Sequence, residues 1–410
     1  MKYKIDASEI RSFVESLKEL YGFDGLMHFT DFKNLKMIFD RGYLYSRSYC
    51  KNNNISFTDG ANHDVLDIAS NDIHQCVRFY YRGSTPTLYN NEGIKLQYYC
   101  NQVHIPIPVY LIFDEELLYL ENTMFSNGNA TTSEIGKSAD FFINMDWDSI
   151  FHYGAFAPHR RDHIINKRQA ELLCCDPVSL KYLRKIVFRC ETDRKRAINI
   201  FGYNIKYEVD KNVFSHKNTS PYTPEYYRNN FIKNYAIRVS YDNIYISAID
   251  MCLLYQKPWH EYDLSVSIFN QNNDMIRNVI IDENSINETR KELRLTGNTL
   301  DWHKIEVGIN DFICIEEYLI KFEIIEHKIT FIDDKVLVLH LKFAHGRYFR
   351  YNHSIEIFSI DNQMVHTTSI KFSKSSSLSW RILLRKYNNN WFKINYYMNG
   401  VLSFSDKIVK

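Results

Sequence analysis

Four segments in the first half of the chain combine polar side chains with turns that could bind or transform a ligand. The first is Met27-His28-Phe29-Thr30, followed by Asn34, where a strand is expected to end at a helix start. A histidine, a hydroxyl and an amide at such a point can hold a ribose or an amide group. A single histidine at a strand end is also a common structural feature, so both interpretations stand for this segment.

Two further segments could contact a nucleotide. Residues 77–83 interleave Arg78 and Arg82 with aromatic residues, an arrangement that stacks on bases and holds phosphates. It equally fits an edge strand whose arginines face solvent. Residues 126–130 form a Ser-Asn-Gly-Asn-Ala loop, whose glycine would let a ligand approach the backbone, unless the loop is an ordinary surface turn.

The fourth segment is Arg168-Gln169-Ala170-Glu171-Leu172-Leu173. A glutamate between an alanine and two leucines is expected on a strand beside the core. A carboxylate in such surroundings often has a perturbed pKa and a catalytic role. Glu171 is therefore a catalytic candidate, although a structural carboxylate would show the same pattern.

The elements around these segments predict a mixed α+β domain. The apolar spacing after Asp6 or Ser8 predicts a helix that ends at Gly22, and a second helix, capped by Thr30, should end at Gly42. Short apolar runs predict buried strands; they are 109–113, 170–174 and 185–188.

In the second half, apolar residues recur at every second position, and the sequence contains an internal repeat. A shift of 89 residues aligns Trp302, Lys304 and Asn310 with Trp391, Lys393 and Asn399, together with the apolar positions between them. This pattern predicts two tandem antiparallel β modules of sandwich type. We expect the repeated tryptophan to lie in the core of each module. The alternative is that the two tryptophans form stacking surfaces for bases or sugars.

Length and composition divide the chain further. At 410 residues it exceeds one ordinary domain, and we expect a mixed α+β domain over 1–208, a linker over 209–237, and β modules over 238–326 and 327–410. The net charge of +1 excludes a uniformly basic nucleic-acid coat. Any nucleic-acid contact must be local, at segments 78–82, 160–168 and 184–196.

Targeting and metal signals are absent from the sequence. No apolar run approaches the ~20 residues of a membrane span, and the N-terminus lacks the apolar stretch of a signal peptide. The eight cysteines are scattered without a C-x-x-C pair, so we expect reduced cysteines, no metal site and a cytoplasmic protein.

Taken in order, these segments resemble the DarT family of NAD-dependent DNA ADP-ribosyltransferases over residues 24–200. The family's His-Phe-Thr and Asn-Leu pattern matches 28–35, its Phe-Tyr segment matches 79–89, and its Asn-Gly loop matches 126–130. An Asp-Trp-Asp at 146–148 and the Arg-Gln-Ala-Glu at 168–171 complete the set. Each motif is weak alone, and the ordered set is specific.

The resemblance implies a split, NAD-binding α+β fold and a role for several residues. His28, Thr30, Asn34 and Tyr81 would hold NAD, the only cofactor expected, and it would be consumed as a substrate. Glu171 would be the catalytic carboxylate. The residues expected to receive the nucleic acid are basic: Arg82, Arg160, Arg161 and Arg168.

One departure from the family pattern affects the acceptor. The family's catalytic arginine lies between the first helix and the Phe-Tyr segment, but residues 49–77 contain no arginine. Arg78 is our candidate for the role, with Arg47 as the alternative. If neither fills it, the first half would be a degenerate scaffold in a non-catalytic binding protein.

The function that the resemblance implies is a toxin-type transfer of ADP-ribose from NAD to a base of single-stranded DNA or RNA. Such an enzyme would act in a toxin–antitoxin or phage-defence system. The β modules would then bind an antitoxin or another regulatory protein. An ADP-ribosyltransferase acting on protein remains the alternative, because acceptor choice depends on loops.

Overall fold

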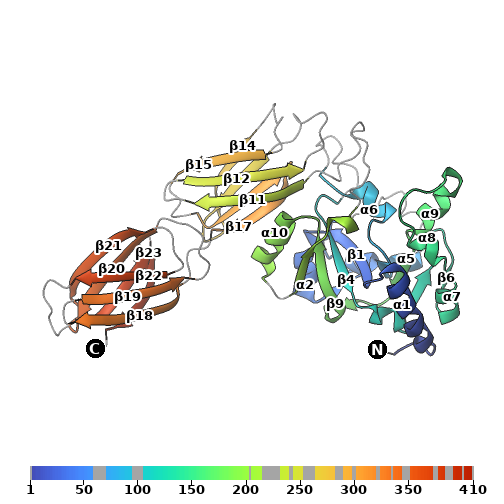
Figure 1. Ribbon diagram of the computed structural model, residues 1–410, viewed down its shortest axis with the longest axis horizontal. Helices are drawn as coiled ribbons and strands as arrows, with labels where there is room; N and C mark the ends of the chain where they lie inside the picture. The colour runs from blue at the N-terminus through green and yellow to red at the C-terminus, as the bar shows by residue number, and fades with distance from the viewer. Residues whose placement is uncertain are drawn as a thin grey trace.

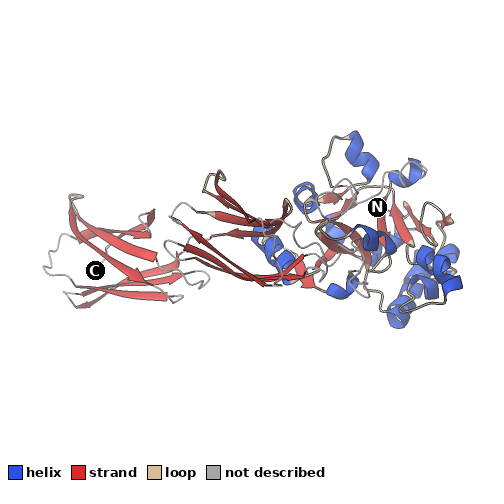
Figure 2. Ribbon diagram, turned by 90° about the horizontal axis from the view of Figure 1, so that it is seen from above, coloured by secondary structure: helices blue, strands red, loops and turns tan. Residues whose placement is uncertain are grey.

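The computed structural model describes most of the chain. The described residues are 2–58, 71–94, 105–202, 205–214, 231–239, 243–252, 264–281, 290–297, 302–319, 324–333, 336–343, 351–372, 377–383, 391–398 and 401–408. Most of the predicted linker, 215–230, therefore lies outside them. Figures 1 and 2 show three units in a row, with the N-terminus on the first and the C-terminus on the last.

The first unit is built on an eight-stranded sheet with the order β10-β9-β4-β1-β3-β7-β5-β6. Its strands are β1 (Leu26–Asp31), β3 (Val77–Tyr80), β4 (Pro108–Phe113), β5 (Thr123–Ser126), β6 (Ile135–Gly136), β7 (Glu171–Cys174), β9 (Leu183–Phe188) and β10 (Lys206–Val209). A separate pair joins β2 (Tyr43–Leu44) to β8 (Val178–Ser179). The predicted strands at 109–113 and 185–188 are confirmed within β4 and β9, and the one at 170–174 is confirmed as β7 except at Ala170.

Helices surround this sheet (Figure 1). They are α1 (Ala7–Tyr21), α2 (Asn34–Arg41), α3 (Arg47–Asn52), α5 (Asn71–His74), α6 (Pro86–Asn91), α7 (Ala139–Ile143), α8 (Trp147–Ile150), α9 (Arg161–Lys167) and α10 (Glu191–Phe201). Gly22 and Gly42 end α1 and α2 with φ of 68° and 70°, as predicted. Thr30 does not cap α2, because it lies inside β1 and bonds with Asn34 instead.

The centre of the sheet is split. β1 pairs with β4 along its whole length, from Leu26↔Phe113 to Asp31↔Pro108. With β3 it shares only one register pair, Met27↔Tyr80. The two strands therefore separate after Met27, and the polar end of β1 is left open toward β3.

The second and third units are β modules with the same connectivity. In module 1, β11 (Phe231–Val239), β12 (Asn243–Cys252) and β15 (Arg290–Thr296) form one sheet. The other sheet has the order β14 (Met275–Ile281), β13 (Leu264–Phe269), β16 (Lys304–Ile309) and β17 (Phe312–Tyr318). β11 begins at Phe231, so this sheet reaches seven residues into the segment expected to be linker.

Module 2 repeats that order. Its sheets are β18 (Ile324–Asp333), β19 (Val336–Phe343) and β22 (Ser377–Leu383), and β21 (Met364–Phe372), β20 (Tyr351–Ser359), β23 (Trp391–Met398) and β24 (Val401–Lys407). Residues from both sheets share one core, for example Leu339 and Ile357. Trp302 is buried in the core of module 1, while the side chain of Trp391 lies outside the described residues.

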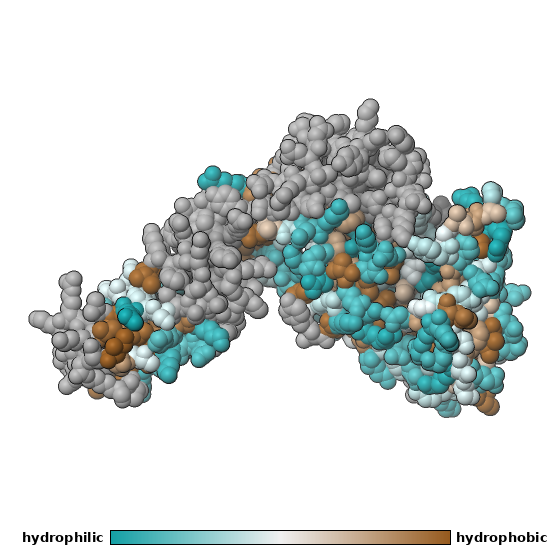
Figure 3. Space-filling model, viewed as in Figure 1, coloured by the Kyte–Doolittle hydropathy of each residue, from teal (hydrophilic) through white to brown (hydrophobic). Residues whose placement is uncertain are grey.

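Neither a membrane helix nor a metal cluster is found in the described ranges. None of their helices combines the length and apolar composition needed to span a bilayer. No three potential metal ligands gather there either. On the face drawn in Figure 3, hydrophilic residues cover most of the described surface of the first unit, with hydrophobic residues scattered among them.

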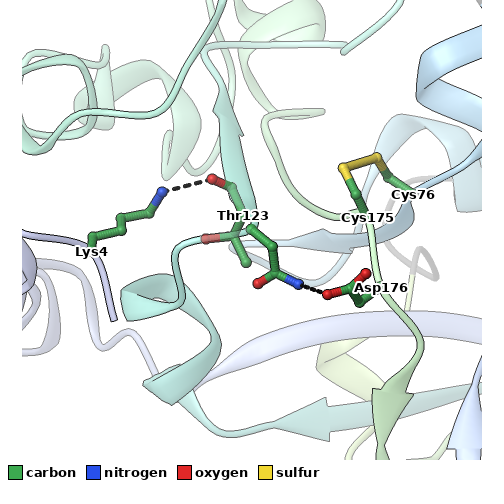
Figure 4. The surroundings of a disulfide bond; sticks show 6 residues. Lys4, Cys76, Thr123, Cys175 and Asp176 are labelled. Carbon is green, nitrogen blue, oxygen red and sulfur yellow. Dashed lines mark hydrogen bonds between the residues drawn. A yellow bond between two sulfur atoms is a disulfide. The ribbon is translucent and has the colours of Figure 1, made fainter. Parts of the chain in front are cut away.

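The structure corrects the expectation that all cysteines are reduced, because Cys76 and Cys175 form a disulfide. Cys76 precedes β3 and Cys175 follows β7, and these strands pair through Val77↔Cys174. The antiparallel pairing brings the two cysteines together although they are 99 residues apart in the chain. Figure 4 shows the bridge near Asp176, Lys4 and Thr123. Asp176 accepts a hydrogen bond from Asn122, and Lys4 donates to the Thr123 carbonyl. Sequence spacing could not reveal a pair that only strand register creates.

We predict that Cys175→Ser lowers the stability of the oxidised protein. A cross-link over 99 residues restricts the unfolded chain by about 4 to 5 kcal/mol in the chain-entropy description. Urea unfolding of the wild type and the variant, each with and without a thiol reductant, measures the effect. Reductant should shift the wild-type midpoint down and leave the variant unchanged. Equal midpoints for all four samples would contradict the pairing.

Candidate active site

A pocket of about 200 Å³ lies where β1 and β3 separate. Its walls come from β1, α2, α3, α5 and β3. Polar groups concentrate on these walls: His28, Thr30, Asp31, Asn34, Ser46, Arg47, Thr58, His74, Arg78, Tyr80 and Thr87. Three of the four predicted NAD-binding residues, His28, Thr30 and Asn34, are therefore in one pocket.

His28 has one defined hydrogen bond and one free ring position. Its Nδ1 lies 2.9 Å from the carbonyl oxygen of Arg78. Because a carbonyl can only accept, Nδ1 carries the proton and donates, which leaves Nε2 as an acceptor. Burial lowers the pKa of His28 from 6.5 to about 4; the hydrogen bond to the Arg78 carbonyl opposes this shift, and the Arg78 charge adds to it. His28 is therefore a neutral imidazole at pH 7.

Thr30 and Asn34 form a fixed polar pair across the start of α2. The Asn34 amide donates to Thr30 Oγ1 over 2.8 Å and to the Thr58 carbonyl over 3.0 Å. Its oxygen accepts from the Thr58 N–H at 2.8 Å. Both the nitrogen and the oxygen of the Asn34 amide are hydrogen-bonded. Asn34 therefore positions β1, α2 and the Thr58 segment relative to one another.

Arg78, which lines the pocket, forms an ion pair with the buried Glu171, which is not among the lining residues. Arg78 donates from Nε to Oε2 over 2.9 Å and from Nη2 to Oε1 over 2.7 Å. The Arg78 side chain is 32% exposed and lines the pocket, whereas that of Glu171 has no exposed surface. Although burial opposes the charged form of Arg78, Glu171 holds its pKa above the ordinary value. The two predicted catalytic residues are thus in contact, with Arg78 nearer the pocket.

Tyr80, and not the predicted Tyr81, reaches the pocket. Side chains alternate along β3, so Arg78 and Tyr80 share one face while Val77 and Phe79 enter the core. Burial, and after it the charge of Glu171, raises the pKa of the Tyr80 hydroxyl. Tyr81 is buried against Trp147 and Phe142.

Gln169, two residues before Glu171, connects α6 with the 126–130 loop. Gln169 Oε1 accepts from Thr87 Oγ1 at 2.9 Å and from Asn129 Nδ2 at 3.2 Å. The 126–130 loop is thereby joined to α6. A Cβ at Gly128 would clash with Asn166 of α9, so this glycine serves close packing of the loop in the structure.

A basic cluster surrounds the 150–154 segment. Arg82 donates to the His152 carbonyl over 2.7 Å, and Arg168 donates to the same oxygen over 3.1 Å. Burial, followed by Arg168, Arg160 and Arg82, lowers the pKa of His152. Arg160 and Arg161 are exposed. The four predicted nucleic-acid contacts therefore lie around α9, although Arg82 and Arg168 also hold the backbone.

The third basic segment does not form an open surface. Arg194 pairs with Glu191 within α10, and Arg196 is buried. Sequence reasoning also missed two pocket residues, Asp31 and Tyr80. Asp31 could have been found because it directly follows the His-Phe-Thr motif. Tyr80 could have been found because side chains alternate along a strand, so Tyr80 shares the face of Arg78 and Tyr81 does not.

We predict that Arg78→Met costs more stability than the double change Arg78→Met/Glu171→Gln. The single change leaves a buried carboxylate without its partner, which costs about 3 to 5 kcal/mol. The double change removes the charge as well, so part of the loss should be recovered. Urea unfolding of both variants and of Glu171→Gln completes the cycle. Additive losses would contradict a direct buried pair.

We predict that His28 destabilises the protein in acid. A folded pKa of about 4 against 6.5 unfolded means that its contribution is full above pH 6.5 and is lost as pH falls toward 4. His28→Asn keeps a donor for the Arg78 carbonyl but cannot titrate. Its urea midpoint should therefore fall less between pH 7.5 and 4.5 than that of the wild type. The exposed His159→Asn is the control, and parallel curves for His28→Asn and wild type would refute the assignment.

Comparisons with known proteins match the first unit. Residues 27–215 fit the family described as ssDNA thymidine ADP-ribosyltransferase, DarT, and no curated protein matches the chain. A structure of Thermus sp. 2.9 DarT with ADP-ribosylated ssDNA is 16% identical, with a TM-score of 0.39, and covers 46% of this chain and 95% of its own.

Two further structures are similar to parts of the chain. Thermosipho africanus DarTG with ADP-ribose is 16% identical, with a TM-score of 0.38, over 47% of this chain and 51% of its own. A two-domain fibronectin type-III segment of chicken tenascin is 9% identical, with a TM-score of 0.18, over 43% and 96%. The family assignment rests on the family match. Residues 27–215 form a DarT-like, NAD-dependent ADP-ribosyltransferase domain.

Proposed function

We propose that this protein transfers ADP-ribose from NAD to a thymine base of single-stranded DNA. The observation that carries the proposal is the ion pair between Glu171 and Arg78, because Arg78 lines the pocket that His28, Thr30 and Asn34 also line. Arg78 thus connects polar groups able to hold a nicotinamide and a ribose to a fixed carboxylate. The family match over the same residues supports this donor and this acceptor.

The pocket suggests how NAD would bind. The free Nε2 of neutral His28 can accept a hydrogen bond from the carboxamide N–H or a ribose hydroxyl. Thr30 and Asn34 hold the adjacent backbone in one arrangement. A neutral imidazole suits a reaction in which positive charge develops on the ribose, because an imidazolium would repel that charge.

Glu171 would then support the bond exchange. The bond between the ribose C1 and nicotinamide breaks, and nicotinamide leaves with the electron pair. A base nitrogen forms the new bond to C1 and passes its proton to Glu171, which releases it to water. A carboxylate beside an oxocarbenium-like ribose also stabilises the transition state.

Arg78 would take the role of the family's catalytic arginine, which has no counterpart among residues 49–77 of this chain. It fixes both carboxylate oxygens, so a ribose hydroxyl or a base N–H would replace one of its two hydrogen bonds when substrate binds. Arg47 also lines the pocket, and we propose that it contacts the NAD phosphates.

The acceptor strand would follow the basic cluster around α9. Arg82, Arg160 and Arg168 act together on His152, which supports a local positive field. Arg168 also lies 5.4 Å from the Phe156 ring, and arginine beside an aromatic ring suits a single-stranded base. Transfer to RNA or protein is the alternative that the test below separates.

We further propose a toxin-type role in a toxin–antitoxin or phage-defence system, with an antitoxin or regulatory partner and a cytoplasmic location. The two sheets of each module, which share a core in module 2, are proposed to be β-sandwiches. Module 2 extends farthest from the transferase unit (Figure 1), and this position supports partner binding there.

We predict that Glu171→Gln lowers transfer by about 100-fold or more, the usual effect of losing such a group. The assay incubates the protein with labelled NAD and oligonucleotides of each DNA base, an RNA and a protein lysate. Label should enter thymine-containing single-stranded DNA. The exposed Glu19→Gln in α1 is the matched control and should retain full activity. Wild-type label confined to RNA or protein, or Glu171→Gln activity equal to wild type, would refute the proposal.

A further inference from the structure

Helix α10 joins the transferase domain to module 1 through buried contacts. α10 packs against β9 and β10 of the transferase sheet and against β11 and β17 of module 1. Cys190, its N-cap, donates to the Ile232 carbonyl over 3.2 Å. Asn199 near its other end donates to the Glu316 carbonyl over 2.8 Å. Figure 1 shows α10 between the two units.

Arg196 is the centre of this junction. Its Nη1 donates to the Ile313 carbonyl over 2.5 Å, and its Nε lies 3.5 Å from Glu316 Oε2. Its guanidinium also covers the Phe32 ring at 4.2 Å. One buried side chain thus contacts β17 of module 1 and the residue that follows β1.

Module 1 also contacts that part of the transferase directly. The turn between β16 and β17 has two residues with positive φ, Asn310 at 46° and Asp311 at 66°. This tight turn is followed by Phe312, whose ring lies 5.6 Å from Lys33 Nζ. Phe32 and Lys33 are the connection between β1 and α2.

The residues on either side of the β1–α2 connection form part of the pocket wall. Asp31 Oδ1 accepts from the Lys33 N–H at 2.9 Å, and Asp31 Oδ2 accepts from the Ile107 N–H at 3.2 Å. Asp31 and Asn34 both line the pocket, on either side of the two residues that module 1 covers. A shift of Phe32 or Lys33 would therefore move both wall residues.

We propose that module 1 is a positioning element of the NAD site, with Arg196 and Phe312 as positioning residues. They hold the β1–α2 connection from outside, so that Asp31 and Asn34 are ready before NAD binds. This inference rests on the proposed function of the pocket. Pre-ordering a binding wall raises affinity because less ordering remains to be done on binding.

The arrangement is specific to module 1. The cores of the transferase domain and module 1 form one continuous cluster, whereas module 2 has a separate core. A contact of the same chemistry exists in module 2, where Lys407 Nζ lies 5.4 Å from the Phe392 ring. It provides a matched control, because it is far from the pocket in the chain.

The test uses the full chain with Phe312→Ala, Arg196→Ala, the conservative Arg196→Lys and, as the control, Phe392→Ala. Calorimetry should give a Kd for NAD that rises about 5- to 10-fold in the first two variants, measured well below their unfolding temperatures. KM for NAD should rise similarly, with kcat changed less. Arg196→Lys should retain more affinity than Arg196→Ala, and Phe392→Ala should bind as the wild type does.

Two results would overturn the inference and are distinguishable. If the wild type binds NAD and the junction variants bind equally well, with only their unfolding temperatures lowered, the junction is merely structural. If the wild type itself does not bind NAD, the proposed function fails together with the inference.

Discussion

The buried carboxylate of Glu171 is the constraint on which the rest of the site depends. A charge with no exposed surface needs a partner with good geometry, and Arg78 supplies two hydrogen bonds to it. That pairing requires β3 and β7 in one register, which the Cys76–Cys175 bridge holds at one end. It also places the Arg78 carbonyl where His28 Nδ1 can donate to it. Strand register, histidine tautomer and ion pair are therefore mutually dependent.

Much of this site was predictable because its chemistry is local in sequence. His28, Thr30 and Asn34 lie within seven consecutive residues, and the Arg-Gln-Ala-Glu motif places a carboxylate at the start of a strand. The period-two pattern and the offset of 89 residues also indicated two β modules before their strands were seen. What the sequence does not reveal depends on long-range geometry. The disulfide needs strand register, and the place of Tyr80 in the pocket needs the parity of β3. Arg196, which lies in a segment expected to contact nucleic acid, bonds with module 1 instead.

The division of the chain is less sharp than its length suggested. A linker was expected between the transferase domain and the modules, but β11 begins at Phe231 and α10 is packed against module 1 on its other side. Buried or partly buried contacts from Arg196, Asn199 and Cys190 join α10 to module 1. Among the described residues, the transferase domain and module 1 share one continuous core, whereas module 2 has a core of its own.

The most direct measurement of the central claim is a crystal structure of the full chain with a non-hydrolysable NAD analogue. Our account predicts the nicotinamide beside His28 and a ribose hydroxyl within hydrogen-bond reach of Glu171, replacing one contact from Arg78. The analogue bound elsewhere, or in this pocket with both Arg78–Glu171 hydrogen bonds intact and the ribose facing away, would contradict it.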